Sequence, residues 1–185
     1  MENKKTDLSS YDNRWYKTGR PVTVRAAWYL VSAVFFTPRL FHSRFLKLTL
    51  LRIFGARLGK GINIKPGVNI KYPWLLEIGD YTWIGENVWI DNLVNVIIGN
   101  NACISQGALL LTGNHNYREV SFGLMTGEIV IEDGAWIGAR AVVCPGIICK
   151  SHSVLTAGST ATSDLEPYAV YQGCPAVKIK ERVIS

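Results

Sequence analysis

The chain has 185 residues and a mass of 20.6 kDa, which fits one domain with an additional arm rather than two large domains. Hydrophobic residues make up 48% of the sequence and charged residues only 18%, a balance that excludes a disordered chain. The net charge of +6 is unevenly placed, because residues 1–60 contain twelve Lys or Arg and only three acidic residues. Such a basic arm predicts an anionic partner, either membrane lipid or a phosphorylated sugar carrier. Nucleic acid is not expected, because no recognition motif accompanies the charge.

Residues 1–57 are predicted to form this basic arm, with two apolar helices. The segments 22–36 and 43–54 are apolar, and Pro38 between them should end the first helix. The helices either cap the open end of the domain that follows or lie at a membrane interface with their basic residues towards lipid phosphate, and the two roles are compatible.

The same part of the chain predicts the cellular location. Residues 1–20 are polar throughout, so no signal peptide is expected, and the longest apolar run, 26–36, is too short to span a bilayer. A cytoplasmic protein is therefore expected, and peripheral contact with the inner face of the cytoplasmic membrane is the alternative that the arm leaves open.

From Leu58 onward an aliphatic or small residue recurs every six positions. A period of six does not fit an α-helix and does fit short strands joined by tight turns, with the recurring residue pointing inward. Gly often follows it, and we expect this Gly where the chain turns. The recurring positions are Leu58, Ile64, Ile70, Ile78, Ile84, Ile90, Ile98, Ile104, Leu110, Ile131, Ile137, Val143, Cys149, Leu155 and Ala161. Three hexapeptides make one triangular coil, so residues 58–166 predict an all-β parallel β-helix, with successive coils stacked about 4.8 Å apart.

Insertions interrupt the repeat. The intervals from Ile70 to Ile78 and from Ile90 to Ile98 are each two residues too long, and residues 113–127 lack the repeat altogether. We predict that 113–127 is a loop outside the prism, and a long loop in a compact repeat domain is usually functional.

His115 is the candidate catalytic residue of this loop. Imidazole is the natural general base at neutral pH. The other histidines are His42 in the arm and His152 at an outward hexapeptide position, which leaves too few for a three-histidine metal site, so no metal is expected. From position alone, an ordinary solvated loop histidine is an equal alternative. The four cysteines contain no C-x-x-C pair and are expected to be free, small buried residues.

Residues 58–176 resemble the hexapeptide-repeat acyltransferases, and within them the maltose, galactoside and nodulation O-acetyltransferase branch. The stretches TGNHNY, VWIDN, CISQGA and EDGAWIGA are similar, more narrowly, to colanic acid biosynthesis acetyltransferases. The resemblance implies a left-handed coil and a homotrimer with active sites between adjacent subunits. It also implies transfer of an acetyl group from acetyl-CoA to a sugar hydroxyl in exopolysaccharide biosynthesis. An N-acyltransferase acting on an amino sugar and a non-catalytic hexapeptide scaffold are the alternatives.

The resemblance also implies acceptor-binding residues. His115 matches the family's base, and Asp91 stands where related enzymes have an Asn that contacts the acceptor sugar. Asn92 and Asn114 are further acceptor-binding candidates. From the residues alone, Asp91 is equally a turn residue that binds its own backbone.

A second set of residues matches the family's acetyl-CoA contacts. Trp136 points outward in the repeat, and a trimer contact is its alternative role, as it is for Trp83 and Trp89. Ser163 and Val177 replace a Lys and an Arg that the family often has. The C-terminal tail, 167–185, is expected to contribute basic residues to CoA, the alternative being a solvated basic end. A backbone N–H near Ala139 is the expected oxyanion donor. The candidates are Trp136, Gly138, Ala139, Ala157, Gly158, Ser159, Thr162, Ser163, Lys178 and Lys180.

Overall fold

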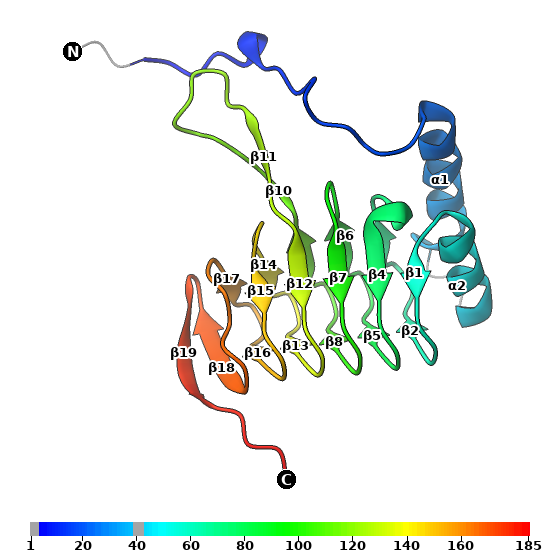
Figure 1. Cartoon of the computed structure of the whole chain (residues 1–185), viewed down its shortest axis with the longest axis vertical. Helices are drawn as coiled ribbons and strands as arrows, with labels where there is room; N and C mark the ends of the chain where they lie inside the picture. The colour runs from blue at the N-terminus through cyan, green and yellow to red at the C-terminus, as the bar shows by residue number, and fades with distance from the viewer. Residues whose placement is uncertain (1–3, 39–42) are drawn as a thin grey trace.

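The computed structural model describes residues 4–38 and 43–185, and most of the chain forms a parallel β-helix with three faces (Figure 1). Face A contains β1 (Arg57–Leu58), β4 (Leu76–Ile78), β7 (Val96–Ile98), β12 (Ile129–Ile131) and β15 (Ile148–Cys149). Face B contains β2 (Asn63–Ile64), β5 (Trp83–Ile84), β8 (Cys103–Ile104), β13 (Trp136–Ile137) and β16 (Val154–Leu155). Face C contains β3 (Asn69–Ile70), β6 (Trp89–Asp91), β9 (Leu109–Leu111), β14 (Val142–Val143) and β17 (Thr160–Ala161).

The six-residue period sets the register between coils. Ile84 pairs with Ile64 and with Ile104, and Ile137 pairs with Ile104 and Leu155, so like residues lie on like residues in every coil. All the recurring positions are buried except Leu58, which is partly buried in the first coil. The fifth hexapeptide position is buried as well, and small residues fit there beside the aliphatic columns. The prediction of a parallel β-helix with inward-facing hexads is confirmed.

The expected role of the Gly after the aliphatic residue is wrong. Left-handed backbone occurs three residues after the aliphatic position instead, for example at Asn87, Gly107 and Arg140. A Cβ at Gly85 or Gly138 would lie 2.7 Å or 2.5 Å from a backbone nitrogen of the next coil. These glycines are therefore required by the close stacking of coils rather than by the turns.

All irregularities of the repeat lie on the edge between faces C and A. The first insertion holds the short 3₁₀ helix η2 (Pro73–Leu75), and the second makes the turn after Asp91. The segment 113–127 leaves the prism on this edge, as predicted. It is more regular than a loop, because β10 (Gly113–His115) and β11 (Leu124–Thr126) pair antiparallel as a hairpin stem.

Two helices, α1 (Val22–Phe35) and α2 (Arg44–Ile53), cover the N-terminal end of the prism (Figure 1). Trp28 Nε1 donates to the Ile70 carbonyl at 2.8 Å, and Lys47 Nζ donates to the Lys65 carbonyl at 3.1 Å. Lys47 therefore points into the cap instead of towards solvent, and burial lowers its pKa. The predicted helices and their capping role are confirmed. His42 lies outside the described residues.

The C-terminal hairpin of β18 (Ala169–Gly173) and β19 (Ala176–Glu181) extends face B beyond β16 at the other end of the prism. The four cysteines are free, as predicted, but burial holds only for Cys149. Cys103 and Cys144 are half-buried and Cys174 is exposed.

Within the described ranges, no helix has the length and apolarity needed to cross a bilayer. Across the same ranges, no group of three or more His, Cys, Asp or Glu side chains is arranged to hold a metal ion.

Candidate active site

His115 ends β10 and lies between two aromatic rings. Its ring stacks on Phe122 with centroids 4.5 Å apart, and the Tyr11 ring lies 5.8 Å away at a tilt. Its Nδ1 is 2.9 Å from the Phe122 carbonyl oxygen, and this contact is a hydrogen bond only if Nδ1 carries the proton. In that tautomer Nε2 keeps its lone pair and can accept a proton from a substrate.

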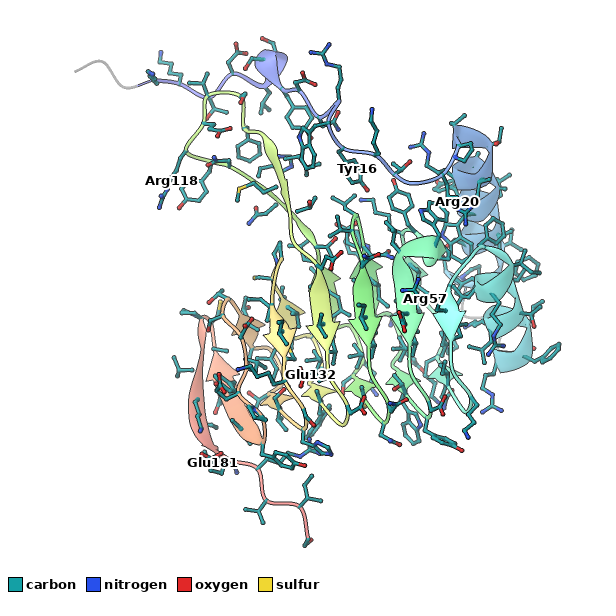
Figure 2. The ribbon with its side chains drawn as sticks, viewed as in Figure 1. Tyr16, Arg20, Arg57, Arg118, Glu132 and Glu181 are labelled. Carbon is teal, nitrogen blue, oxygen red and sulfur yellow. The ribbon has the colours of Figure 1, made fainter. Side chains whose placement is uncertain are left out.

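The N-terminal segment holds the His115 hairpin in place. The Asp7 N–H donates to the Val120 carbonyl at 2.8 Å, and the Tyr16 hydroxyl donates to the Leu93 carbonyl at 2.7 Å. Trp74 Nε1 donates to the Thr18 carbonyl at 2.7 Å. Figure 2 shows this segment passing above the prism from α1 to the hairpin, with the short 3₁₀ helix η1 (Leu8–Ser10) near its far end. We call the segment 7–18 the strap. The sequence alone does not predict its position, and the signal that could have indicated it is the group of aromatic residues Tyr11, Trp15 and Tyr16, which need something to pack against.

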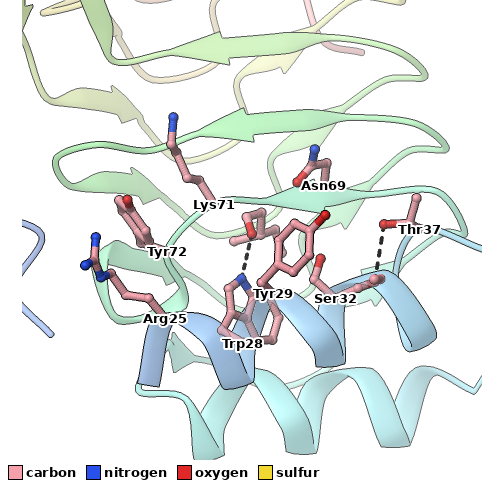
Figure 3. A pocket seen from close by; sticks show the side chains of 10 residues that line it. Arg25, Trp28, Tyr29, Ser32, Thr37, Asn69, Lys71 and Tyr72 are labelled. Carbon is pink, nitrogen blue, oxygen red and sulfur yellow. Dashed lines mark hydrogen bonds between the residues drawn. The ribbon is translucent and has the colours of Figure 1, made fainter. Parts of the chain in front are cut away.

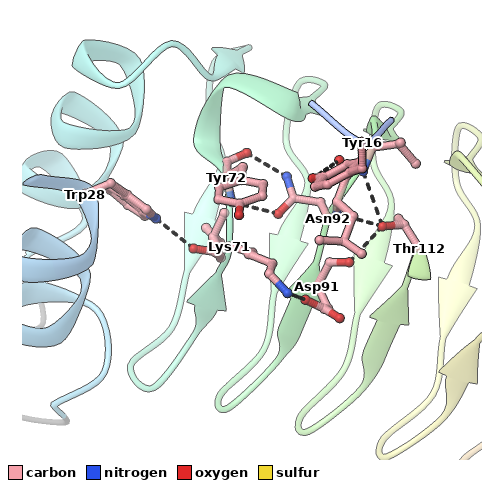
Figure 4. A network of polar contacts seen from close by, with 10 residues as sticks. Tyr16, Trp28, Lys71, Tyr72, Asp91, Asn92 and Thr112 are labelled. Atoms are coloured by element: carbon pink, nitrogen blue, oxygen red, sulfur yellow. Dashed lines mark hydrogen bonds and ion pairs between the residues drawn. The ribbon is translucent and has the colours of Figure 1, made fainter. Parts of the chain in front are cut away.

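Asp91 lies on the same edge, one coil before the hairpin. It is 14% exposed and pairs with Lys71 Nζ at 2.7 Å (Figure 4). The Tyr16 hydroxyl lies nearby, and its pKa is raised, first by burial and then by the charge of Asp91 and by Tyr72. A carboxylate, an ammonium and a phenol hydroxyl are thus grouped where hydroxyl groups of a ligand would find donors and acceptors.

The two other acceptor-binding candidates differ. Asn92 is fully buried, its Nδ2 donates to the Tyr72 carbonyl at 2.6 Å, and its Oδ1 accepts from the Tyr72 N–H at 3.0 Å. It joins two neighbouring coils, so the predicted contact with the acceptor does not fit its position. Asn114 is exposed, and its Oδ1 accepts from the His115 N–H at 2.8 Å. Asn114 remains a candidate for acceptor binding.

The acetyl-CoA candidates centre on the edge between faces B and C. Trp136 points outward, as predicted, is 46% exposed and donates from Nε1 to Ser105 Oγ at 2.8 Å. It lines a cavity of about 730 Å³ together with Thr156 and Lys180, so β13 and the C-terminal hairpin share one cavity. Ala139, Ala157 and Gly158 lie on the turns of this edge, and the Gly158 N–H donates to the Ala139 carbonyl at 2.8 Å.

Several residues predicted to contact CoA lie elsewhere in the fold, either buried in the prism or on another edge. Gly138 is buried against the next coil, and Ser159 is buried with its Oγ accepting from the Gly173 N–H at 3.0 Å, so both serve the packing of the prism. Thr162 and Ser163 follow β17 and lie on the edge between faces C and A, on the other side of face C from Ala157. Lys178 pairs with Glu181 at 2.6 Å, which partly neutralises the charge expected for phosphate.

The two groups of candidates flank face C on opposite edges. His115 and Asp91 lie on the edge between C and A, whereas Ala139 and Gly158 lie on the edge between B and C. Within one chain, the candidate base is therefore separated from the candidate acetyl-CoA contacts by the width of face C.

Comparisons with known proteins identify the family. No family model matches the chain. WcaF of Escherichia coli strain K12, whose name assigns it to colanic acid biosynthesis as an acetyltransferase, is 34% identical over 179 residues, covering 96% of this chain and 97% of WcaF.

Solved structures agree with this relationship. A maltose O-acetyltransferase of Clostridium difficile superimposes with a TM-score of 0.78 at 22% identity, covering 98% of this chain and all of that one, and this likeness shows the fold. A galactoside acetyltransferase solved with coenzyme A gives a TM-score of 0.75 at 25% identity, covering 86% of this chain and 80% of that one. The chain therefore belongs to the hexapeptide-repeat acetyltransferases, enzymes built on a left-handed parallel β-helix.

Proposed function

We propose that the enzyme transfers the acetyl group of acetyl-CoA to a hydroxyl of a sugar in exopolysaccharide biosynthesis. The observation that carries this proposal is His115, whose Nδ1 lies against a backbone carbonyl and whose Nε2 has no hydrogen-bond partner among residues 4–38 and 43–185. It lies on the same edge of the prism as the polar group of Asp91, Lys71 and Tyr16. WcaF, which aligns along nearly the whole chain, is named for colanic acid biosynthesis, and its name supports the choice of a polysaccharide acceptor.

In the proposed reaction, Nε2 of His115 takes the proton of the sugar hydroxyl as the oxygen attacks the thioester carbon. A new C–O bond forms and the C–S bond of the thioester breaks, and the imidazolium returns its proton to the departing thiolate. The Phe122 carbonyl stabilises the imidazolium, because Nδ1 donates to it throughout. The backbone N–H near Ala139 remains our prediction for the oxyanion donor.

The site is proposed to be completed between subunits of a homotrimer. Because His115 lies on the edge between faces C and A and the cavity beside Trp136 lies on face B, we expect a neighbouring copy to bring its own cavity to His115. Exposed aromatic residues, Trp83 and Trp136 on face B and Trp89 on face C, are suited to such an interface.

Complementation tests this arrangement. His115→Ala and Trp136→Glu are each expected to be inactive alone, but trimers assembled randomly from both variants should regain about a quarter of the parent activity. Activity returns because the intact His115 of one subunit faces the intact groove of another. Variants that stay inactive in mixed trimers of confirmed mass would show that both residues act within one chain.

The reaction itself is tested by a panel of acceptors with CoA release as the readout. We expect acetylation of sugars that offer hydroxyl groups, and loss of an O-acetyl group, seen by mass spectrometry, from the polysaccharide of a strain lacking this enzyme. Faster transfer to amino sugars would favour the N-acyltransferase alternative. A chain that binds no acetyl-CoA in calorimetry would be a scaffold.

The cytoplasmic face of the membrane is the place we propose for this reaction. Both cap helices expose large apolar side chains, including Leu30, Phe45 and Ile53, and the exposed Arg44 begins α2. Apolar and basic side chains on one cap are suited to the interface of an anionic bilayer, where a lipid-linked sugar would be available.

Vesicle flotation tests the membrane contact. The enzyme is expected to float with vesicles that contain phosphatidylglycerol and to stay below with pure phosphatidylcholine, because the basic arm supplies part of the attraction. Phe45→Asp should reduce flotation, since it removes an exposed apolar side chain without touching the core. A parent enzyme that never floats, at low or high salt, would contradict the proposal.

A further inference from the structure

A second cavity lies beside the candidate acceptor site and has no assigned role. Its volume is about 450 Å³, within the range of sugar-sized ligand sites, and it lies between α1 and the first coil of face C (Figure 3). Lys71 lines this cavity and also pairs with Asp91, so the cavity and the acceptor site share a wall.

The lining has the composition of a carbohydrate site. Tyr29 and Tyr72 present aromatic rings, and Ser32, Thr37 and Asn69 present hydroxyl and amide groups. The buried Trp28 adds apolar lining, its Nε1 already bonded to Ile70. Sugars are bound by such a mixture, because their C–H faces pack on rings while their hydroxyls need donors and acceptors.

Arg25 is the unusual member of this lining. Its Nε is buried, and no atom of residues 4–38 or 43–185 accepts a hydrogen bond from it. No carboxylate within those ranges forms an ion pair with its guanidinium. A buried donor without an acceptor destabilises the protein, and a bound acceptor group would remove that cost.

The charges around the cavity indicate which kind of ligand group would accept the hydrogen bond of Arg25. Lys71 is neutralised by Asp91, so Arg25 supplies the unbalanced positive charge on this lining. The Tyr16 hydroxyl, which lies near Arg25 and Asp91, is neutral near pH 7 like any phenol, and burial raises its pKa further. A guanidinium presents a planar fork of donors that matches a carboxylate or a phosphate.

We propose that this cavity binds an anionic unit of the glycan acceptor, with Arg25 holding its carboxylate or phosphate while a neighbouring sugar presents its hydroxyl near Asp91 and His115. The inference rests on the proposed function and adds the substrate class to it. A uronic acid would supply a carboxylate, and a lipid-linked or nucleotide-linked sugar would supply a phosphate.

The test compares three acceptors on the full-length enzyme: a uronic-acid-containing oligosaccharide, the same oligosaccharide after carboxyl reduction, and the glycosyl diphosphate of the reduced oligosaccharide. We expect kcat/KM for at least one anionic acceptor to exceed that of the neutral one by about tenfold or more. Arg25→Gln should abolish this preference, and Arg25→Lys should keep part of it. Lys5→Gln, which removes an exposed charge from the same arm, is the matched control and should keep the full preference.

The outcomes separate the two proposals. Acetylation of all three acceptors at equal rates would overturn the anionic site and leave the acetyl transfer intact. Acetylation of none would overturn the proposed function. In that case calorimetry without donor still decides the site, because Arg25-dependent binding of the acidic oligosaccharide supports it and its absence overturns it. The acceptor that shows the preference identifies the carboxylate or the phosphate as the source of the charge.

Discussion

Replacing His115 with Ala is expected to lower kcat by at least about a hundredfold and to leave the proposed trimer assembled. The loss is expected because the hydroxyl must then attack the thioester carbon with no base to take its proton, while the prism does not use this side chain in its core. The ring packs between Phe122 of the hairpin that leaves the prism and Tyr11 of the strap. The measurement is CoA release at saturating acetyl-CoA and acceptor, together with the molecular mass in solution.

His152 provides the matched control. It is stacked on Tyr168 with ring centroids 4.7 Å apart, and its Nδ1 lies 2.7 Å from Ser151 Oγ, on the edge between faces A and B. His152→Ala should therefore retain the parent kcat. If His115→Ala worked at the parent rate, or if both variants lost activity equally, His115 would not be the base.

Gly138→Ala is expected to have the second large effect, a loss of about 3 kcal/mol in the free energy of unfolding. The added Cβ would lie 2.5 Å from the Ala157 backbone nitrogen and 2.7 Å from the Leu155 carbonyl oxygen. Neither atom can move without separating two coils. A lowered thermal midpoint, measured at equal protein concentration, checks this prediction.

Gly158→Ala is the control on the next coil. Gly158 has a φ of +70° and open space around its Cβ position, so Ala there meets only the backbone strain of about 1–2 kcal/mol. Gly138→Ala should therefore lower the thermal midpoint more than Gly158→Ala. Equal shifts would show that coil stacking tolerates a Cβ at Gly138 and that close stacking of the coils does not require a glycine there.

The prism was predictable from the sequence because its contacts are periodic. Each inward residue contacts the same kind of residue one coil away. The spacing of Ile64, Ile84 and Ile104 in the sequence therefore predicts how their strands pair. The excursion at 113–127 was predictable for the same reason, since it is where the period fails.

The directions of individual turn residues were less predictable. Asn92 directly follows Asp91, and the two side chains face opposite ways. Asn92 is fully buried between coils, whereas Asp91 is 14% exposed and pairs with Lys71. In an extended chain, successive side chains point to opposite sides. Resemblance to a short motif therefore cannot tell which of two adjacent residues faces the acceptor and which faces the core. Ser159 lies in a stretch that resembles the family's CoA contacts, but its Oγ accepts a hydrogen bond from the Gly173 N–H of the C-terminal hairpin.

The sequence by itself determined the coils, the inward columns, the two helices at the arm and the single histidine in the excursion. The tertiary structure alone decided that the strap brings Tyr11 to His115 and Tyr16 to Leu93, and that α1 places Arg25 beside Lys71. The physical reason is that the contacts of a repeat follow from its short sequence period. The arm instead contacts residues about 45 to 110 positions away, and these contacts follow no period.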